Sequence, residues 1–261
     1  MKISSLKILA LCAFLFGAVN ANAQFDLGKA IGAGEKLLQS FTLSDNQVAA
    51  YVKETVAKMD KENNVLPDTD PYSQRLAKLT ANLKDVDGIP LNFKVYKTNE
   101  INAFACPDGS VRVYTGIMDL LDDNELLGVI GHEVGHVAKH HSRKAMQKAL
   151  QNDAFKDVLS STGGSIAKLT DSQLGAIATS LASANYSQKQ EKEADEYGYQ
   201  FLVMNKVNPW GIVSAFEKMQ SLEGPAAQSG YITKMFSSHP DTASRIKNMT
   251  KKCVKSGYER P

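Results

Sequence analysis

Two histidines and a glutamate within five residues carry the strongest chemical signal in this sequence. His132 and His136 are four positions apart, and Glu133 follows the first of them directly. In an α-helix this spacing puts both imidazoles on one face, about 6 Å apart along the axis, so both can reach one ion. Glu133 then flanks the ion without binding it, which suits a general base that takes a proton from water. The pattern predicts a catalytic zinc site.

A catalytic zinc needs a third protein ligand and a position open to water. A third histidine six residues past His136 would supply the ligand, but Ser142 stands there. A second helix offers an alternative, because Glu191 and Asp195 are four apart and share a face. One carboxylate can bind zinc while the other accepts a hydrogen bond from a ligand histidine and fixes its orientation. Glu193 points away from that face, and we expect it to be solvated or paired with a lysine.

The sequence has three more histidines, two of them just after the zinc motif. His140 and His141 continue the zinc helix. His140 shares the face of His136, but one more turn carries it about 6 Å from the metal, so we expect a structural role for it. His239 precedes a proline, which favours a non-helical backbone just before a new helix that contains Arg245. A histidine on such a loop can stabilise negative charge on a substrate oxygen. A surface histidine is the simpler alternative.

Helices must position these side chains. Asp122 and Glu125 have the spacing of a capping box, so the zinc helix is predicted to start there and to run to about Leu150. Gly131 and Gly135 lie inside it, and each costs about 1 kcal/mol relative to alanine. These glycines therefore predict the close approach of a strand or a second helix.

The rest of the pattern predicts an α+β fold. Helices are expected after Ser44 and after Pro71, the second ending at the turn 87–90. Alternating apolar residues over 91–114 predict short strands, and Pro107-Asp108-Gly109 predicts a hairpin turn between the last two. The following residues look mostly helical. We therefore expect a small sheet packed by several helices.

The first 23 residues have the three-part layout of a signal peptide. Two lysines precede an apolar run over 8–19, and Ala21-Asn22-Ala23 forms a cleavage site. The run of about 12 residues is short for a membrane span, which disfavours an uncleaved tether. We expect a signal peptide (1–23), one domain (24–261), and a periplasmic or secreted protein after cleavage near Ala23.

Charge and cysteine content exclude some partners and leave one question open. The chain has 30 basic and 28 acidic residues, and removing 1–23 takes away two lysines and no acid, leaving 28 of each. A neutral chain without a basic stripe predicts no nucleic-acid partner and little attraction to an anionic membrane. Cys106 and Cys253 would remain, and an oxidising compartment permits a disulfide between them without their spacing deciding it.

These motifs together resemble the gluzincin metallopeptidases that include HtpX, BepA, LoiP and the CAAX prenyl proteases, and most of all the periplasmic LoiP-type enzymes. The similarity covers nearly the whole mature chain, including 41–45, 102–105, 114–118, both zinc motifs and the last His-Pro. It implies a zincin-like domain with one Zn²⁺ per chain, Glu191 as third ligand and Asp195 as its support. His239 would then lie near the zinc, stabilising an oxyanion or occupying the open position, with Arg245 beside it.

The resemblance also implies substrates and a location. The stretch Asn102, Ala103, Phe104 and Ala105 would be an edge strand that receives the substrate as an added strand. The implied function is an endopeptidase of the cell envelope that hydrolyses unfolded or misfolded proteins, with possible peripheral association with the outer membrane. The chain differs from HtpX and the prenyl proteases, which have several membrane spans, and from BepA, which has an appended repeat domain. Two alternatives remain open: a zinc-bearing chaperone or binding module with latent or no protease activity, and an enzyme acting on a non-peptide bond such as a cell-wall amide.

Overall fold

A computed structural model describes residues 45–150, 170–222 and 238–261 of the chain, so the expected signal peptide (1–23) lies outside the described residues. This part is mostly helical with two small sheets, which confirms the predicted α+β class. The helices are α2 (Asp45–Glu62), α3 (Pro71–Leu79), α4 (Thr115–Leu120), α5 (Asp123–Ala138), α6 (His141–Leu150), α8 (Asp171–Ala182), α9 (Gln188–Met204), α10 (Trp210–Ser221) and α12 (Thr242–Lys255). The strands are β1 (Asp85–Val86), β2 (Ile89–Pro90), β3 (Asn92–Tyr96), β4 (Ala103–Ala105) and β5 (Ser110–Tyr114).

The larger sheet has three strands in the order β3-β5-β4. β4 and β5 are antiparallel, with Ala103 opposite Val113, which confirms the predicted hairpin. Its turn requires a glycine, because Gly109 has φ +85° and a Cβ there would lie 2.1 Å from the Pro90 carbonyl oxygen. β3 pairs parallel to β5, an arrangement that the local pattern did not predict.

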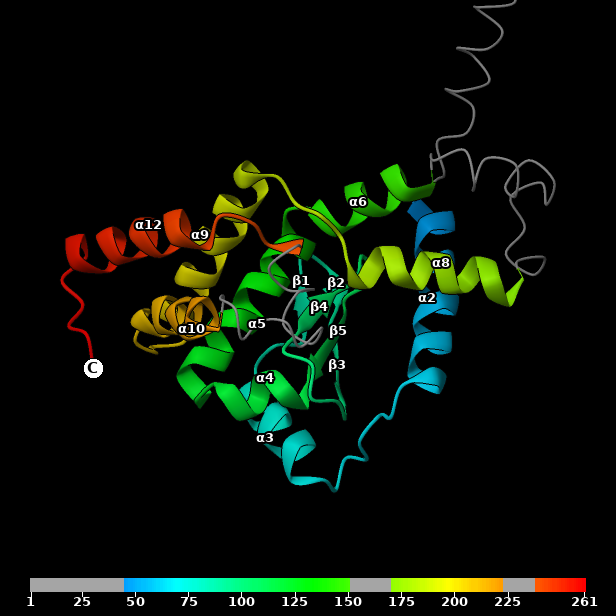
Figure 1. The fold of residues 1–261 in the computed structure, drawn as a ribbon, viewed down its shortest axis with the longest axis horizontal. Coiled ribbons are helices and arrows are strands. Elements are labelled where there is room, and N and C mark those ends of the chain that lie inside the picture. Colours follow the sequence, from blue (N-terminus) through cyan, green and yellow to red (C-terminus); the bar gives the residue numbers. More distant parts are fainter. Residues whose placement is uncertain (1–44, 151–169, 223–237) are drawn as a thin grey trace, which may run out of the picture. The chain divides into compact units, whose positions relative to one another are not determined.

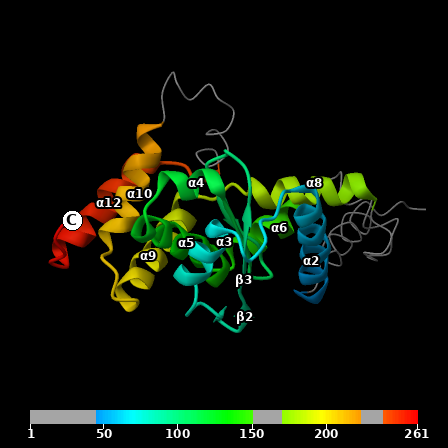
Figure 2. The ribbon, with the colours of Figure 1, turned by 90° about the horizontal axis from the view of Figure 1, so that it is seen from below.

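The helix α5 lies at the centre of the described structure, against the larger sheet and the helices α9 and α10 (Figure 1). Every residue from Glu125 to Ala138 is buried, so this helix has no solvent face. It starts at the predicted capping box, in which Glu125 N–H donates to Asp122 Oδ1 and Asp122 N–H donates to Glu125 Oε2, both at 2.9 Å. Helices α2 and α8 lie on one side of this centre and α10 and α12 on the other (Figure 2).

Two glycines of α5, Gly131 and Gly135, lie where α9 approaches it. A Cβ on Gly131 would lie 2.6 Å from the Phe201 ring, and a Cβ on Gly135 would lie 2.9 Å from Tyr197 Cβ and 3.1 Å from the Ala194 carbonyl oxygen. The predicted close approach of a second helix is therefore confirmed. Because α5 carries the histidine pair and α9 carries Glu191, this contact brings the two motifs together.

The prediction that the zinc helix runs to about Leu150 was wrong. The helix α5 ends at Ala138, and a new helix, α6, begins at His141. Between them His140 has φ +55°, in the left-handed region, which ends the α-helical hydrogen-bond ladder. Of the two adjacent histidines, His140 is exposed and His141 is buried.

The turn predicted to end the second helix has a different role. The helix α3 ends earlier, at Leu79, where Thr80 N–H donates to the Leu76 carbonyl. Asp87 and Gly88 join β1 to β2 instead, and both have positive φ, as a two-residue hairpin turn requires. The prediction that this turn ends the helix was wrong, because the turn belongs to a hairpin.

A buried ion pair ties α2 to the larger sheet. The Arg112 side chain on β5 is 2% exposed, and its Nε donates to Asp60 Oδ1 at 2.8 Å. Asp60 also accepts from the Tyr96 hydroxyl at 2.7 Å and from Lys94 Nζ at 2.7 Å. Burial alone would raise the pKa of Asp60, but these donors, Arg112 first, hold it below its usual value. The pair contributes stability only while Asp60 is ionised.

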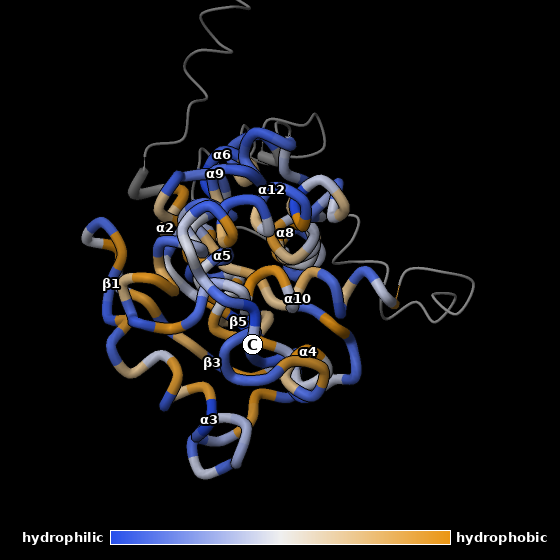
Figure 3. The backbone as a smooth tube through the Cα atoms, turned by 90° about the vertical axis from the view of Figure 1, so that its left-hand side faces the viewer, coloured by the Kyte–Doolittle hydropathy of each residue, from blue (hydrophilic) through white to orange (hydrophobic). Residues whose placement is uncertain are grey.

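The two cysteines of the expected mature chain do not pair. Cys106 and Cys253 are both buried free thiols, in separate apolar clusters, so they form no disulfide. Single helices contain both hydrophilic and hydrophobic residues (Figure 3), as expected for helices that bury one face. Among the described helices, none has the length and apolar character needed to cross a membrane.

Candidate metal centre

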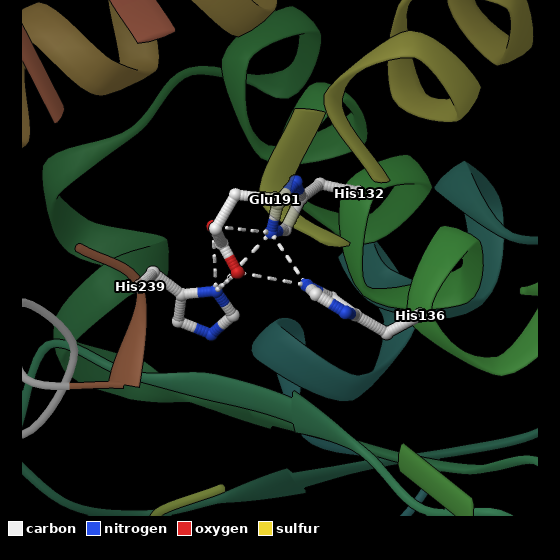
Figure 4. Close-up of side chains that lie close together, drawn as sticks. All are labelled: His132, His136, Glu191 and His239. Carbon is white, nitrogen blue, oxygen red and sulfur yellow. Dashed lines mark hydrogen bonds and ion pairs between the residues drawn. The ribbon is translucent and has the colours of Figure 1, made fainter. Parts of the chain in front are cut away.

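Four side chains from three separate segments converge at one point (Figure 4). His132 and His136 come from α5, Glu191 comes from the first turn of α9, and His239 comes from the segment just before α12. Each offers one ligand atom, and these atoms all lie within 4.8 Å of one another. All four residues are buried. The predicted ligands are therefore neighbours in space, together with His239.

Most of the distances between these atoms are close to those expected around one tetrahedral ion. His132 Nε2 lies 3.1 Å from His136 Nε2 and 3.2 Å from His239 Nδ1. Glu191 Oε1 lies 3.3 Å from His136 Nε2 and 3.2 Å from His239 Nδ1, and Glu191 Oε2 lies 3.6 Å from His132 Nε2. Bonds of about 2.0–2.1 Å to one tetrahedral zinc would separate its ligand atoms by about 3.3 Å. Nitrogen and oxygen donors of this kind suit Zn²⁺.

Asp195 and Arg245 contact the predicted metal ligands His132 and Glu191. Asp195 Oδ1 lies 2.9 Å from His132 Nδ1, the nitrogen that points away from the centre. Arg245 Nη2 donates to Asp195 Oδ1 at 2.7 Å, and Nη1 lies 2.9 Å from Glu191 Oε2. Burial alone would raise the pKa of Asp195, but the Arg245 charge holds it below its usual value. Arg245 Nη2 also lies 3.2 Å from His132 Nδ1, and Arg245 and His239 share Glu191 as a partner, while their direct contact stays a prediction.

Glu133 lies next to the four atoms without joining them. Its side chain is 2% exposed, and Oε1 accepts no hydrogen bond from the described residues. His239 Nε2 is 3.5 Å from that oxygen. Burial raises the pKa of Glu133, and the neighbouring histidines oppose the rise. A buried carboxylate with an unused acceptor, beside a metal-type donor set, is suited to take a proton from water.

His239 is a buried residue, which removes the alternative of a surface histidine. Its Nδ1 is within 3.2 Å of both Glu191 oxygens. Burial alone would lower the pKa of His239, but Glu191 and Glu133 raise it above its usual value. The same ring thus contacts the donor set through Nδ1 and the candidate base through Nε2.

Sequence reasoning missed two residues that contact His136. The Tyr186 ring stacks on the His136 imidazole, with 3.7 Å between centroids and 22° between planes. His141 Nδ1 lies 3.2 Å from His136 Nδ1, and His141 Nε2 lies 2.9 Å from Glu193 Oε2. Glu193, expected to be solvated or paired with a lysine, has His141 as its close partner, and Lys189 is farther away at 3.9 Å. No sequence signal indicated Tyr186, whereas His141 was noted as a continuation of the zinc helix without a predicted contact to His136.

The expected substrate-binding stretch forms an edge of the sheet. Ala103, Phe104 and Ala105 make up β4, which pairs with β5 alone among the strands that the structure describes. β4 also packs against α5, the helix that carries the histidine pair. Asn102 precedes the strand, and its buried Nδ2 has no hydrogen-bond partner among the described residues.

Comparisons with known proteins agree with this geometry. The model of peptidase family M48 matches residues 67–252. Metalloprotease YcaL of Escherichia coli is 38% identical over 245 residues, which cover 94% of each chain. Metalloprotease LoiP of the same organism is 36% identical over 261 residues, covering 99% of this chain and all of LoiP. The beta-barrel assembly-enhancing protease of Yersinia pestis is 27% identical over 233 residues, covering 85% of this chain and 45% of that protein.

Proposed function

The chain belongs to peptidase family M48 and is a metalloendopeptidase, and we propose that it uses one Zn²⁺ to hydrolyse peptide bonds in unfolded or misfolded proteins of the cell envelope. His132, His136 and Glu191 would hold the ion. The convergence of their ligand atoms at tetrahedral spacing, from two helices, is the observation that carries this proposal. When bound, zinc supplies a Lewis acid that activates water and polarises a carbonyl.

The protein's own residues would provide the proton transfers. Glu133 Oε1, buried and without a hydrogen-bond donor among the described residues, would take a proton from the attacking water and pass it to the leaving amine. Burial raises the pKa of Glu133, which makes its carboxyl a better proton acceptor than an exposed one. Asp195, held by Arg245, would keep the His132 ring oriented with Nε2 toward the ion.

His239 supports two roles in this scheme. Its Nδ1 lies among the four converging atoms, which favours a resting form in which the imidazole fills the fourth position. If the ring swings away, a protonated His239 beside Glu133 could stabilise negative charge on the substrate oxygen. The first role predicts that His239→Ala raises activity, and the second predicts that it lowers activity.

The substrate would bind along β4. An extended peptide added to this edge, through Ala103, Phe104 and Ala105 with Asn102 at its start, would bind through main-chain hydrogen bonds. Such binding selects for extended conformation more than for sequence, which agrees with unfolded proteins as substrates. The signal-peptide layout of residues 1–23 supports a periplasmic or secreted location, with the mature domain beginning after Ala23.

The direct test compares the parent with Glu133→Gln, using the exposed Glu54→Gln on α2 as a matched control. All three proteins should contain one zinc per chain by elemental analysis. Casein cleavage should fall by about 10²–10⁴-fold in Glu133→Gln alone, the usual contribution of a general base. Undiminished cleavage in that variant would remove the proposed base, and protein without zinc would remove the site.

A zinc-bearing chaperone or binding module is the second candidate, because a donor set that includes His239 describes a protein that is inert at rest. Cleavage by His239→Ala separates the candidates. A latent protease changes its rate in either direction, whereas a module that only binds unfolded chains stays inactive and still suppresses their aggregation.

A further inference from the structure

The break between α5 and α6 gives His141 a position that a continuous helix would not. In an unbroken helix His140, four residues after His136, would share its face. The left-handed backbone at His140, φ +55°, instead turns His140 into solvent and brings His141 to the edge of the His136 ring. The centroids of these two imidazoles are 5.2 Å apart. The His141 side chain is 2% exposed.

The hydrogen bonds of this pair have one self-consistent assignment. If His136 binds the ion through Nε2, it is neutral and carries its proton on Nδ1. That N–H donates to His141 Nδ1, 3.2 Å away, which must then be unprotonated. The His141 proton therefore lies on Nε2, where it donates to Glu193 Oε2 at 2.9 Å. Every ring nitrogen has a partner of the right kind, in a line from the metal site to a half-exposed carboxylate.

We propose that His141 is a positioning residue that orients the metal ligand His136 and connects it to Glu193. This assignment rests on the proposed zinc site, and it means that the two histidine ligands are oriented by different groups. His132 has its orienting carboxylate, Asp195, in direct contact at 2.9 Å. His136 reaches its carboxylate through a second imidazole, with the Tyr186 ring stacked on its face.

A buried histidine that only fills space is the alternative explanation, and three substitutions distinguish it. His141→Leu fills the site but removes the acceptor for His136 Nδ1–H. His141→Asn keeps an acceptor oxygen near the position of Nδ1 and removes the connection to Glu193. The control is His140→Asn, at the exposed neighbouring position, where asparagine tolerates the left-handed backbone.

Glu193 can be tested with its own matched control. Glu193→Gln weakens the acceptor for His141 Nε2–H, whereas Lys189→Gln removes the other partner of Glu193 and leaves His141 in place. Both positions are on the same helix and are at least partly exposed, so neither substitution disturbs the core.

The experiment measures zinc affinity by competition with a chromophoric chelator, together with the unfolding temperature of each metal-free protein. We expect His141→Leu to bind zinc about 10- to 100-fold more weakly, as is typical when a residue that orients a ligand is lost. His141→Asn should recover most of the loss, Glu193→Gln should show a smaller loss, and both controls should match the parent. Metal-free unfolding temperatures should stay close to that of the parent, since the role concerns the metal.

Other outcomes would overturn the inference without touching the protease assignment. Parent-like affinity in both His141 variants would show that His136 needs no such support. Equal losses in the leucine and asparagine variants, matched by lower metal-free unfolding temperatures, would show a packing role alone. If His141→Leu does not fold, His141→Asn and Glu193→Gln still decide, because parent-like affinity in both refutes the proposed connection. Absence of zinc binding by the parent would refute the metal site itself, which is a separate result.

Discussion

Replacing Gly135 by alanine tests the helix contact that brings the two metal-binding motifs together. The added Cβ would lie 2.9 Å from Tyr197 Cβ, 3.1 Å from the Ala194 carbonyl oxygen and 3.2 Å from Ala194 Cα. These are backbone or backbone-attached atoms of α9, so no flexible side chain can move aside. Ordinary carbon contacts are about 3.5–4.0 Å, so the helices must separate locally by about half an ångström or more.

The expected change in stability on Gly135→Ala follows from two opposing effects. Alanine in a helix interior is favoured over glycine by about 1 kcal/mol. Overpacking a tight contact costs about 1–3 kcal/mol. Gly175 on α8 separates these effects, because a Cβ there meets nothing within 4 Å. Gly175→Ala should therefore stabilise the protein by up to about 1 kcal/mol, and Gly135→Ala should be about 1–3 kcal/mol less stable than Gly175→Ala.

Urea unfolding of the metal-free proteins measures this difference, with Glu133→Gln present in every variant to prevent self-cleavage. In thermal unfolding the same difference should appear as about 2–4 °C for each kcal/mol, given the size of the chain. Zinc affinity should fall in Gly135→Ala alone, because Ala194 lies within one turn of Glu191 and moves with α9. A Gly135→Ala protein as stable as Gly175→Ala, with parent-like zinc affinity, would refute the tight contact between α5 and α9.

Two further predictions concern parts of the fold outside the metal centre. Asp60→Asn leaves the Arg112 charge buried and uncompensated, so it should cost about 3 kcal/mol at pH 7 in urea unfolding. Since the folded-state pKa of Asp60 is lowered, its contribution to stability is complete above about pH 4 and is lost as the pH falls further. The difference in unfolding free energy between parent and variant should therefore narrow in acid. A difference that stays constant with pH would contradict the ion pair. Cys106 and Cys253 should react with a thiol reagent only after unfolding, because both are buried and burial raises the pKa of Cys253 to about 11; failure to find both thiols in the denatured mature protein would indicate a disulfide.

Local chemistry made much of the metal centre predictable. The spacing of His132, Glu133 and His136 depends only on helix geometry, and the same is true of Glu191 and Asp195 on α9. The capping box and the β4–β5 hairpin were also predictable, because their signals lie within a few residues.

Errors arose where the chain's long-range packing overrides local preference. Nothing between Ala138 and His141 forbids a continuous helix, yet His140 adopts a left-handed backbone and the helix divides there. A lone Asp-Gly is equally compatible with the end of a helix and with a hairpin, and the pairing of Val86 with Ile89 decides between them.

The sequence by itself determined which side chains can bind a metal, because ligand chemistry and helical periodicity are properties of residue type and spacing. It also determined the mostly helical α+β class, through its hydrophobic periods and turn residues. Only the tertiary structure decided that His239 joins the ligand atoms, that Tyr186 stacks on His136, and that His141 connects His136 to Glu193. The physical reason is distance along the chain: these contacts join separate segments or cross a helix break, so they form only when α5, α9 and the segment before α12 pack together.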